Sequence, residues 1–270
     1  METAVHRAGA RRRTVLVVLL LLLALAAPAA AQQLAVDPLW DGIAAGAGLL
    51  LAGGSELLFS TIAATPPDLG GVDIEKVNGL DRATMFPYSE GIDIASTALE
   101  ITSFLIPIGL VFLLPSDQWL GATLVYAESM SAAVILKNGL KWAFPRYRPY
   151  VYPGQTDNGS PTDTDWYASF PSGHTTVAFA AATFGSVLFA TYYPTSPYLV
   201  PVIAGSYAVA ALTGSFRIFA GQHFLTDVLV GAAVGAACGY LVPLAHQAGF
   251  TGTGTGKSVR VEIPLVSVGL

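Results

Sequence analysis

The chain has 270 residues, of which 53% are hydrophobic and only 11% are charged. Soluble domains carry about 25% charged residues, so this composition excludes an ordinary water-facing surface and indicates a protein embedded in a membrane. The net charge of −5 provides no attractive field for a polyanion, which excludes nucleic acid as a partner. Cys238 is the only cysteine of the sequence, so an intrachain disulfide and a cysteine-based zinc cluster are excluded as well.

Residues 1–31 have the pattern of a bacterial secretory signal peptide. Basic residues precede an apolar run at 15–27, and Ala29-Ala30-Ala31 provides a cleavage site before Gln32. We therefore expect a signal that is cleaved after Ala31 and a chain that is exported. An uncleaved signal anchor is the alternative.

Five apolar stretches are candidate membrane helices, and a sixth follows them. They cover about residues 43–63, 97–114, 118–137, 174–193 and 198–214, with the sixth at 223–243. The sequence thus predicts an all-α fold, a polytopic membrane bundle of five to six apolar helices formed by residues 32–243 and followed by a polar tail, 244–270. A run that resembles a phosphate loop, 252–258, lacks the first glycine and the flanking strand and helix of that motif, so we interpret it as a linker.

Long polar loops alternate with short connections between these helices. The long loops at 64–96, 138–173 and 215–222 then share one membrane face, and the connections at 115–117 and 194–197 share the other. Export favours the outer face for the long loops, so we expect an active site at the periplasmic side of a bacterial inner membrane. If the signal is cleaved, this orientation requires that 43–63 lies against the bundle or the interface without crossing.

The first motif is the run Phe170-Pro171-Ser172-Gly173-His174 before an apolar stretch. Ser172 is a good N-cap residue, so a helix is predicted to begin here. The unpaired N–H groups of its first turn and the helix dipole can hold an anion beside the imidazole of His174. The alternative is a helix cap with an incidental histidine.

A second motif contains Lys141 and Arg148, which enclose an aromatic loop. Lysine offers a point charge, and arginine offers a planar fork that can grip two phosphate oxygens. The alternative is a group of basic and aromatic side chains at the membrane interface.

The third motif contains Arg217, His223 and Asp227. If His223 opens the last helix, Asp227 lies one turn further on the same face, where its carboxylate can accept the proton of one ring nitrogen. The other nitrogen is then free to attack. The alternative is a structural i,i+4 pair.

Together the three motifs resemble the signature of the type 2 phosphatidic acid phosphatase superfamily, which shares its site with bacterial class A acid phosphatases and vanadium haloperoxidases. The family pattern is Lys, six residues and Arg-Pro; then Pro-Ser-Gly-His; then Ser-Arg, five residues, His, three residues and Asp. The residues that match it in this order are Lys141, Arg148-Pro149, Pro171-Ser172-Gly173-His174, Arg217, His223 and Asp227. One position departs from the pattern, because Phe216 precedes Arg217 and the nearest serine is Ser215.

The resemblance implies a phosphoric ester hydrolase that needs no metal or cofactor and acts on a lipid phosphate or pyrophosphate in the membrane. It implies that His223 attacks phosphorus to form a phosphohistidine, that Asp227 orients His223 and that His174 protonates the leaving oxygen. The phosphate-binding residues that it implies are Lys141, Arg148, Ser172, Gly173 and Arg217.

Three other functions fit parts of the sequence. A secreted, soluble acid phosphatase of the same superfamily would use the apolar segments as a core, and a vanadate-dependent haloperoxidase would share the pocket. A membrane scaffold or transporter with a decayed site is supported only by Phe216. Composition and the complete set of motifs favour the lipid phosphatase. Glu100 and Glu128 lie inside apolar segments, where carboxylates are costly, and we do not assign them to the site.

Overall fold

The computed structural model describes residues 34–63, 72–152 and 166–247. The long helices are α2 (Trp40–Ala63), α4 (Glu90–Val111), α5 (Trp119–Ala143), α6 (Gly173–Tyr192), α7 (Leu199–Phe219) and α8 (Leu225–Gln247). The short elements are α3 (Gly79–Arg82) and the 3₁₀ turns η2 (Ile74–Lys76), η3 (Ser116–Gln118) and η4 (Pro149–Val151). The predicted signal peptide, 1–31, and the run at 252–258 lie outside the described residues.

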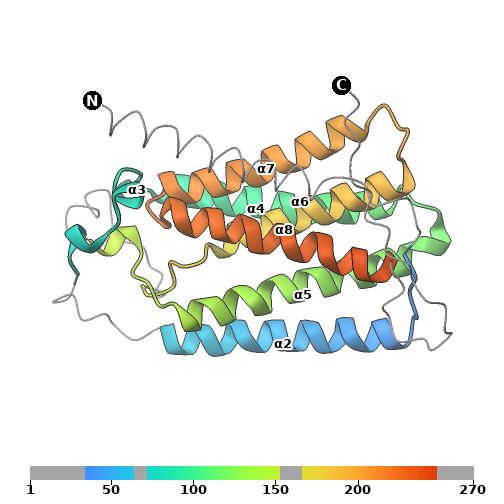
Figure 1. Ribbon diagram of the computed structural model, residues 1–270, viewed down its shortest axis with the longest axis horizontal. Coiled ribbons are helices and arrows are strands. Elements are labelled where there is room, and N and C mark those ends of the chain that lie inside the picture. Colours follow the sequence, from blue (N-terminus) through green and yellow to red (C-terminus); the bar gives the residue numbers. More distant parts are fainter. Residues whose placement is uncertain (1–33, 64–71, 153–165, 248–270) are drawn as a thin grey trace, which may run out of the picture.

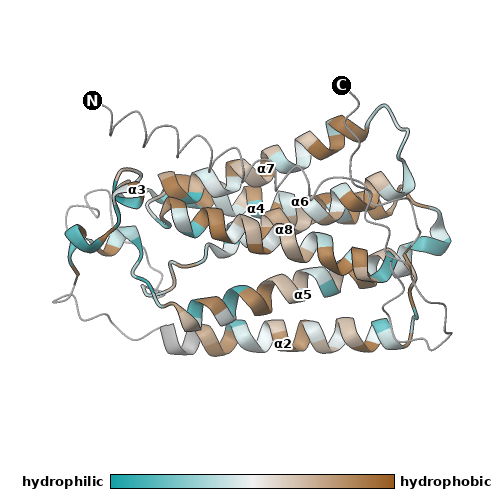
Figure 2. Cartoon of the chain, viewed as in Figure 1, coloured by the Kyte–Doolittle hydropathy of each residue, from teal (hydrophilic) through white to brown (hydrophobic). Residues whose placement is uncertain are grey.

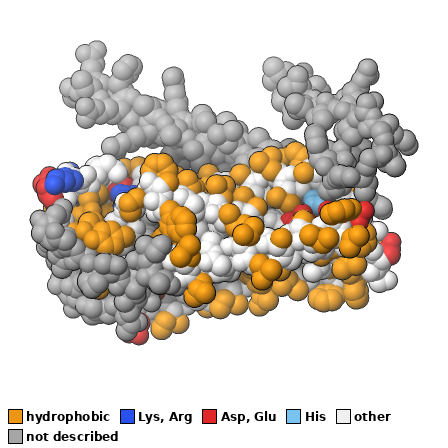
Figure 3. Space-filling model, turned by 90° about the horizontal axis from the view of Figure 1, so that it is seen from below, with side chains coloured by type: hydrophobic (Ala, Val, Ile, Leu, Met, Phe, Trp, Pro, Cys, Tyr) orange, Lys and Arg blue, Asp and Glu red, His pale blue; other side chains and the backbone are white. Residues whose placement is uncertain are grey.

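The six long helices are each long and apolar enough to cross a membrane. Their side chains are mostly apolar, whereas hydrophilic residues gather in the loops and near the helix ends (Figure 2). In the face that Figure 3 shows, hydrophobic side chains lie along the length of the bundle and charged side chains lie toward its two ends. The predicted all-α membrane bundle is confirmed, with six long helices in the described part of the chain.

Three helix boundaries differ from the prediction in a way that matters for the site. Helix α4 begins at Glu90, α5 continues to Ala143 and α7 continues to Phe219. Glu90 and Asp93 lie in the first turn of α4, where negative charge interacts favourably with the helix dipole. Polar residues that had suggested loops are therefore the first and last turns of membrane helices.

Helix α6 lies at the centre of the bundle, and α2 lies at its edge. Most of α6 is buried and it contacts α4, α5, α7 and α8, whereas α2 packs mainly on α5. Figure 1 shows that α2 runs alongside α5 over its length, so α2 is a sixth candidate span rather than a helix lying across the membrane interface. Consecutive long helices run in opposite directions, and the loops that carry the motifs meet at one end, on the left of Figure 1.

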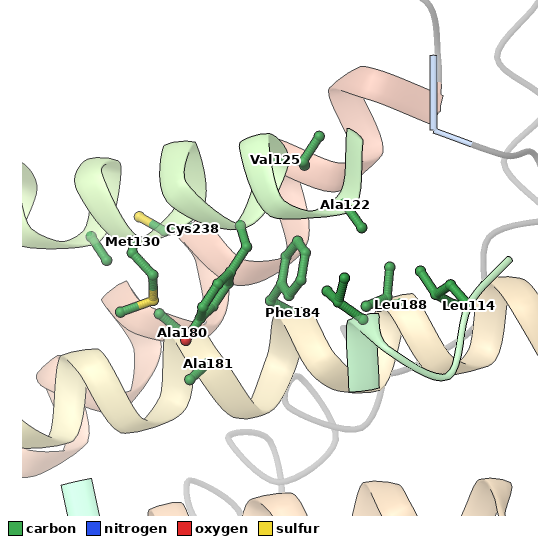
Figure 4. Close-up of a cluster of buried hydrophobic side chains, with 12 residues drawn as sticks. Leu114, Ala122, Val125, Met130, Ala180, Ala181, Phe184, Leu188 and Cys238 are labelled. Carbon is green, nitrogen blue, oxygen red and sulfur yellow. The ribbon is translucent and has the colours of Figure 1, made fainter. Parts of the chain in front are cut away.

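A hydrophobic cluster holds α5, α6 and α8 together at the middle of the bundle. Phe184 and Leu188 of α6 point toward Val125 and Ala122 of α5, and Cys238 of α8 joins them (Figure 4). Phe184 has no exposed surface. This packing holds the helix that carries His174 in place.

Helices α6 and α8 approach closely because α8 places glycines at every fourth position. Built Cβ atoms on Gly231, Gly235 and Gly239 would lie 2.6, 2.1 and 2.3 Å from backbone carbonyl oxygens of Ser172 and of α6. Small residues at this spacing let two membrane helices pack backbone to backbone. The contact fixes the start of α6 against the start of α8, where the motifs lie.

Candidate active site

The eight predicted site residues all lie at the motif end of the bundle. They come from the end of α5, the loop after it, the start of α6, the end of α7 and the start of α8 (Figure 1). The backbone N–H of Ser172 donates to the carbonyl of Asp227 at 3.0 Å, which joins the first motif to the third. A guanidinium nitrogen of Arg148, from the second motif, lies 3.2 Å from Nε2 of His223. Three sequence-distant motifs therefore form one site.

His223 is 1% exposed and is held through both ring nitrogens. Its Nδ1 lies 2.7 Å from the carbonyl oxygen of Ser169, and its Nε2 lies 3.2 Å from a guanidinium nitrogen of Arg148. A carbonyl can only accept and a guanidinium can only donate, so Nδ1 carries the proton and Nε2 carries the lone pair. The lone pair of Nε2 thus faces the guanidinium of Arg148.

The electrostatic surroundings of His223 favour its neutral form. Burial lowers the pKa of His223 well below its usual range, and the positive charges of Arg148, Arg217 and Lys141 lower the pKa further. A neutral imidazole is the form that can act as a nucleophile. The hydrogen-bond contacts and the surrounding charges therefore both support a neutral His223.

Asp227 is fully buried, but it does not bind His223 directly as the i,i+4 spacing had suggested. The distance between Nδ1 of His223 and Oδ2 of Asp227 is 3.9 Å, beyond hydrogen-bonding range. Helix α8 begins only at Leu225, so His223 precedes the helix and the helical spacing does not apply. Asp227 acts through Ser169, whose hydroxyl donates to Oδ2 at 2.6 Å while its carbonyl accepts from His223.

Arg146 and Asp81 are two residues that the sequence did not assign to the site. Arg146 donates to Asp227 at 2.6 Å and to Asp81 at 2.7 Å, and its guanidinium lies 4.1 Å from the centre of the Phe224 ring. Asp81 also accepts from the backbone N–H and the hydroxyl of Thr226, at 2.9 and 2.7 Å. The first of the long loops therefore caps the start of α8.

The ionised state of Asp81 is strongly supported. Burial alone would raise the pKa of Asp81, but the hydrogen bonds from Arg146 and Thr226 outweigh burial and hold the pKa below its usual value. The guanidinium of Arg146 therefore bridges two carboxylates, because it donates to Asp227 through its other nitrogen. No short sequence motif could reveal this arrangement, since Asp81 and Arg146 are 65 residues apart.

The predicted phosphate-binding cations are buried and already oriented by protein groups. Lys141 donates to the carbonyl of Ala168 at 2.8 Å, and Arg148 donates to the side chain of Gln222 at 2.7 Å. Arg217 forms an ion pair with Asp93 and donates to the hydroxyl of Ser96 at 3.1 Å. These contacts fix the direction of each positive charge before a substrate binds.

Ser96 supplies a hydroxyl to Arg217 in a chain that has Phe216 where the family pattern has a serine. The pattern has a serine directly before the arginine of the third motif, and this chain has Phe216 there. The hydroxyl of Ser96, from α4, contacts the guanidinium of Arg217 instead. A hydroxyl partner for this arginine is therefore present, but it comes from another helix.

Ser172 and Gly173 form the start of α6, as predicted. Ser172 is the N-cap residue, but its hydroxyl accepts from Thr175 at 2.9 Å instead of capping a backbone N–H. A built Cβ on Gly173 would lie 3.4 Å from the side chain of Lys137, which shows how closely that cation approaches the helix start. The positive end of the helix dipole faces the site.

His174, the next residue of α6, is held at Nε2 by two residues of α4. The Oγ1 atom of Thr97 lies 3.2 Å from Nε2, and a carboxylate oxygen of Glu100 lies 3.3 Å from it. Glu100 had been left out of the site. Polar residues at 93, 96, 97 and 100 of the chain follow helical spacing in an otherwise apolar segment, and that pattern is the signal that could have identified them.

Within the described ranges, one group of three potential metal ligands was found. Asp41, Glu128 and His246 lie together at the other end of the bundle, and Glu128 is paired with His246 at 2.7 Å. The site around His223 instead combines two histidines with fixed cations. Its donor set suits a phosphate rather than a metal ion.

Comparisons with known proteins agree with the motifs. Residues 122–250 match the sequence model of the PAP2 superfamily. Lipid A 1-phosphatase of Porphyromonas gingivalis is 37% identical over 128 residues, which cover 47% of this chain and 24% of that protein. Phosphatidylglycerophosphatase B of Bacillus subtilis is 28% identical over 155 residues, which cover 54% of this chain and 70% of that protein.

This chain also resembles the solved structure of LpxE from Aquifex aeolicus, with 24% sequence identity and a TM-score of 0.42. The match covers 63% of this chain and 98% of the LpxE chain. The match to lipid A 1-phosphatase spans about a quarter of that relative's length. The resemblance drawn from the three motifs is confirmed by the family match, which contains all of them.

Proposed function

Because residues 122–250 of this chain belong to the PAP2 superfamily, we propose that the protein is a phosphatase that hydrolyses a lipid phosphate or pyrophosphate in a bacterial membrane. The observation that carries the proposal is the state of His223. Its Nε2 bears a lone pair, faces Arg148 and is fixed by the hydrogen bond of Nδ1 to Ser169. A buried, neutral and oriented imidazole beside fixed cations is suited to attack phosphorus.

In the first step, Nε2 of His223 attacks phosphorus and the bond to the leaving oxygen breaks. The electron pair of that bond goes to the leaving oxygen, which takes a proton from His174. The charge on the equatorial oxygens is balanced by Lys141, Arg148 and Arg217, with the start of α6 at Ser172 and Gly173. The product is a phosphohistidine and a free alcohol or lipid phosphate.

In the second step, water attacks phosphorus of the phosphohistidine. His174 accepts the proton of the water, the nitrogen–phosphorus bond breaks and its electron pair returns to His223. Asp227 acts through Ser169 and Arg146 to keep His223 in the attacking tautomer. The fixed cations supply the positive charge that a metal ion supplies in other phosphatases, so we expect the reaction to proceed without one.

The substrate class follows from the place of the site at one end of an apolar bundle. Among the described residues, six helices are long and apolar enough to cross a membrane, which supports a site near the lipid headgroups. The two curated relatives are named for lipid A and phosphatidylglycerophosphate. We propose a lipid phosphate at the periplasmic face, with undecaprenyl pyrophosphate, phosphatidylglycerophosphate, phosphatidic acid and lipid A phosphates as the substrates to compare.

The test is phosphate release from this panel of lipids by purified protein in the presence of EDTA. We expect release from at least one lipid, and a phosphoenzyme that acid destroys and alkali preserves, as for a phosphorus–nitrogen bond. His223→Ala should abolish both. His246→Ala, a histidine at the opposite end of the bundle, is the matched control and should retain turnover per folded molecule. Full activity of His223→Ala would refute the mechanism, and complete loss of wild-type activity in EDTA would refute metal independence.

A further inference from the structure

One face of α4 supplies polar partners to two residues of the site. Asp93 and Ser96 contact Arg217, and Thr97 and Glu100 contact His174. The spacing of these four residues places them on one side of the helix. Helix α4 lies outside the segment 122–250 that matches the family, so these contacts are read from this chain alone.

The contacts at His174 define which nitrogen is held. Thr97 donates its hydroxyl proton to the carbonyl of Asp93 at 3.2 Å, so its oxygen can accept a proton from Nε2 of His174. Glu100 offers a second acceptor at 3.3 Å from the same nitrogen. Two acceptors at Nε2 fix a proton there, which leaves Nδ1 as the nitrogen that exchanges a proton with the substrate.

A carboxylate beside His174 also meets an electrostatic need. Four buried or nearly buried cations act on this imidazole, namely Arg217, Arg148, Lys141 and Lys137. A general acid must carry a second proton on the ring, and a neighbouring carboxylate stabilises the positive charge of that form among these cations. Glu100 is the acidic side chain within 4 Å of the ring among the described residues, while Lys137 is already paired with Glu56.

We propose that Glu100 is a positioning residue of this reaction, which orients His174 and stabilises its imidazolium form while Nδ1 donates a proton to the leaving oxygen. The inference rests on the proposed phosphatase function. In the step itself, the proton passes from Nδ1 to the leaving oxygen as the phosphorus–oxygen bond breaks, and Nε2 keeps its proton against Glu100. The ring returns to the neutral form and regains a proton from the attacking water in the second step.

The test compares two substrates that differ in how much they need an acid. Phosphatidic acid releases an alcohol, a poor leaving group that needs protonation, whereas p-nitrophenyl phosphate releases a far more acidic phenol. For Glu100→Gln we expect kcat/KM to fall about 10- to 100-fold with phosphatidic acid, since a general acid contributes about 10²- to 10⁴-fold. With p-nitrophenyl phosphate we expect a fall of less than about 3-fold.

Glu128→Gln is the matched control, because it makes the same change beside a histidine at the far end of the bundle. It should leave the ratio of the two kcat/KM values unchanged. His174→Ala should show the same selective loss of kcat/KM with phosphatidic acid as Glu100→Gln. The double variant should lose no more kcat/KM than His174→Ala alone, since the two residues act as one unit. Should Glu100→Gln fail to fold, Glu100→Asp retains the charge and should show the same selectivity in weaker form.

An equal loss with both substrates, or additive effects of the two substitutions, would overturn the inference and assign Glu100 a structural role. These outcomes differ from failure of the proposed function, in which the wild-type protein releases phosphate from no lipid of the panel. They also differ from a failed nucleophile assignment, in which His223→Ala remains active.

Discussion

At the scale of the residue, the protonation state of His223 is the feature on which the chemistry depends. Burial and the charges of Arg148, Arg217 and Lys141 lower the pKa of His223 well below its usual range, so the folded protein favours the neutral ring. The unfolded chain would bind a proton near pH 6.5, and the folded chain would not. Folding stability from this residue is therefore complete above that pH and is lost as the pH falls toward the lowered pKa.

We predict that ¹⁵N NMR of the histidine side chains will show His223 protonated at Nδ1 and unprotonated at Nε2 throughout pH 6–8. The signal is assigned by its loss in His223→Ala, and the sequence contains only four histidines. A proton on Nε2, or titration of the ring near pH 6.5, would contradict the tautomer that Ser169 and Arg148 impose.

The motif residues of the site were predictable from the chain, but their partners were not. Lys141, His174 and His223 stand in recognisable patterns of residue type and spacing. The partners of Arg146 and Arg217 are separated from them by 65 and 124 residues, and only the packing of the bundle brings them together. The predicted direct contact of His223 with Asp227 was wrong because the chain is not yet helical at His223.

At the scale of the element, Asp81 attaches the segment before α4 to the start of α8. Replacing it with asparagine leaves the guanidinium of Arg146 without one of its two carboxylates and weakens the cap on Thr226. Breaking a buried ion pair on one side costs about 3–5 kcal/mol. We predict that Asp81→Asn lowers the thermal stability of the purified protein and the phosphatase rate together.

Asp73→Asn is the control for Asp81→Asn. Asp73 is exposed and caps η2 through the N–H of Glu75, a role that asparagine fills equally well. The thermal stability of Asp73→Asn should therefore match that of the wild type. If Asp81→Asn were as stable and active as this control, the segment before α4 would have no part in holding the site.

The close contact of α6 with α8 leads to a second prediction, that Gly235→Ala destabilises the protein. A Cβ on Gly235 would lie 2.1 Å from the carbonyl oxygen of Thr176, so the two helices must move apart to accept alanine. Overpacking of this kind costs about 1–3 kcal/mol. Gly205→Ala, where a Cβ meets nothing within 4 Å, is the matched control and should be neutral or stabilising. Equal melting temperatures for the two variants would contradict the close contact.

The helices themselves were predictable because each is a long apolar run, and this signal depends little on tertiary structure. Their ends were harder to predict. Glu90 and Asp93 are polar enough to suggest a loop, yet they form the first turn of α4, where the helix dipole favours them and Arg217 pairs with Asp93. Where the end of a membrane helix contributes polar residues to a site, its sequence is not apolar, and a search for apolar runs misses it.

At the scale of the whole molecule, the six helices place both ends of the described chain at the end opposite the site (Figure 1). If all six cross the membrane and the site faces the periplasm, residue 34 lies on the cytoplasmic side. A signal cleaved after Ala31 would place the same residue in the periplasm. A cleaved signal, a crossing α2 and a periplasmic site are therefore incompatible, and one of the three expectations must fail.

Helix α2 has the features of a crossing helix, since it runs along α5 and exposes leucines such as Leu50 and Leu57 along its length. We therefore predict that α2 crosses, that the site is periplasmic and that no cleaved signal precedes it. Single cysteines at Glu75, Asp117 and Pro38 in a Cys238→Ala background test this with a membrane-impermeant maleimide on spheroplasts. Glu75→Cys should react at once, and the other two only after permeabilisation.

The three positions separate the possible failures, because each reports one of the expectations. Reaction of Asp117→Cys without permeabilisation, with Glu75→Cys protected, would place the site in the cytoplasm and contradict the proposed face. Reaction of Pro38→Cys together with Glu75→Cys would show that α2 does not cross, and would agree with either a cleaved signal or an uncleaved signal anchor. Since Cys238 is the only native cysteine and is buried among helices α5, α6 and α8, its replacement by alanine should leave the loops undisturbed.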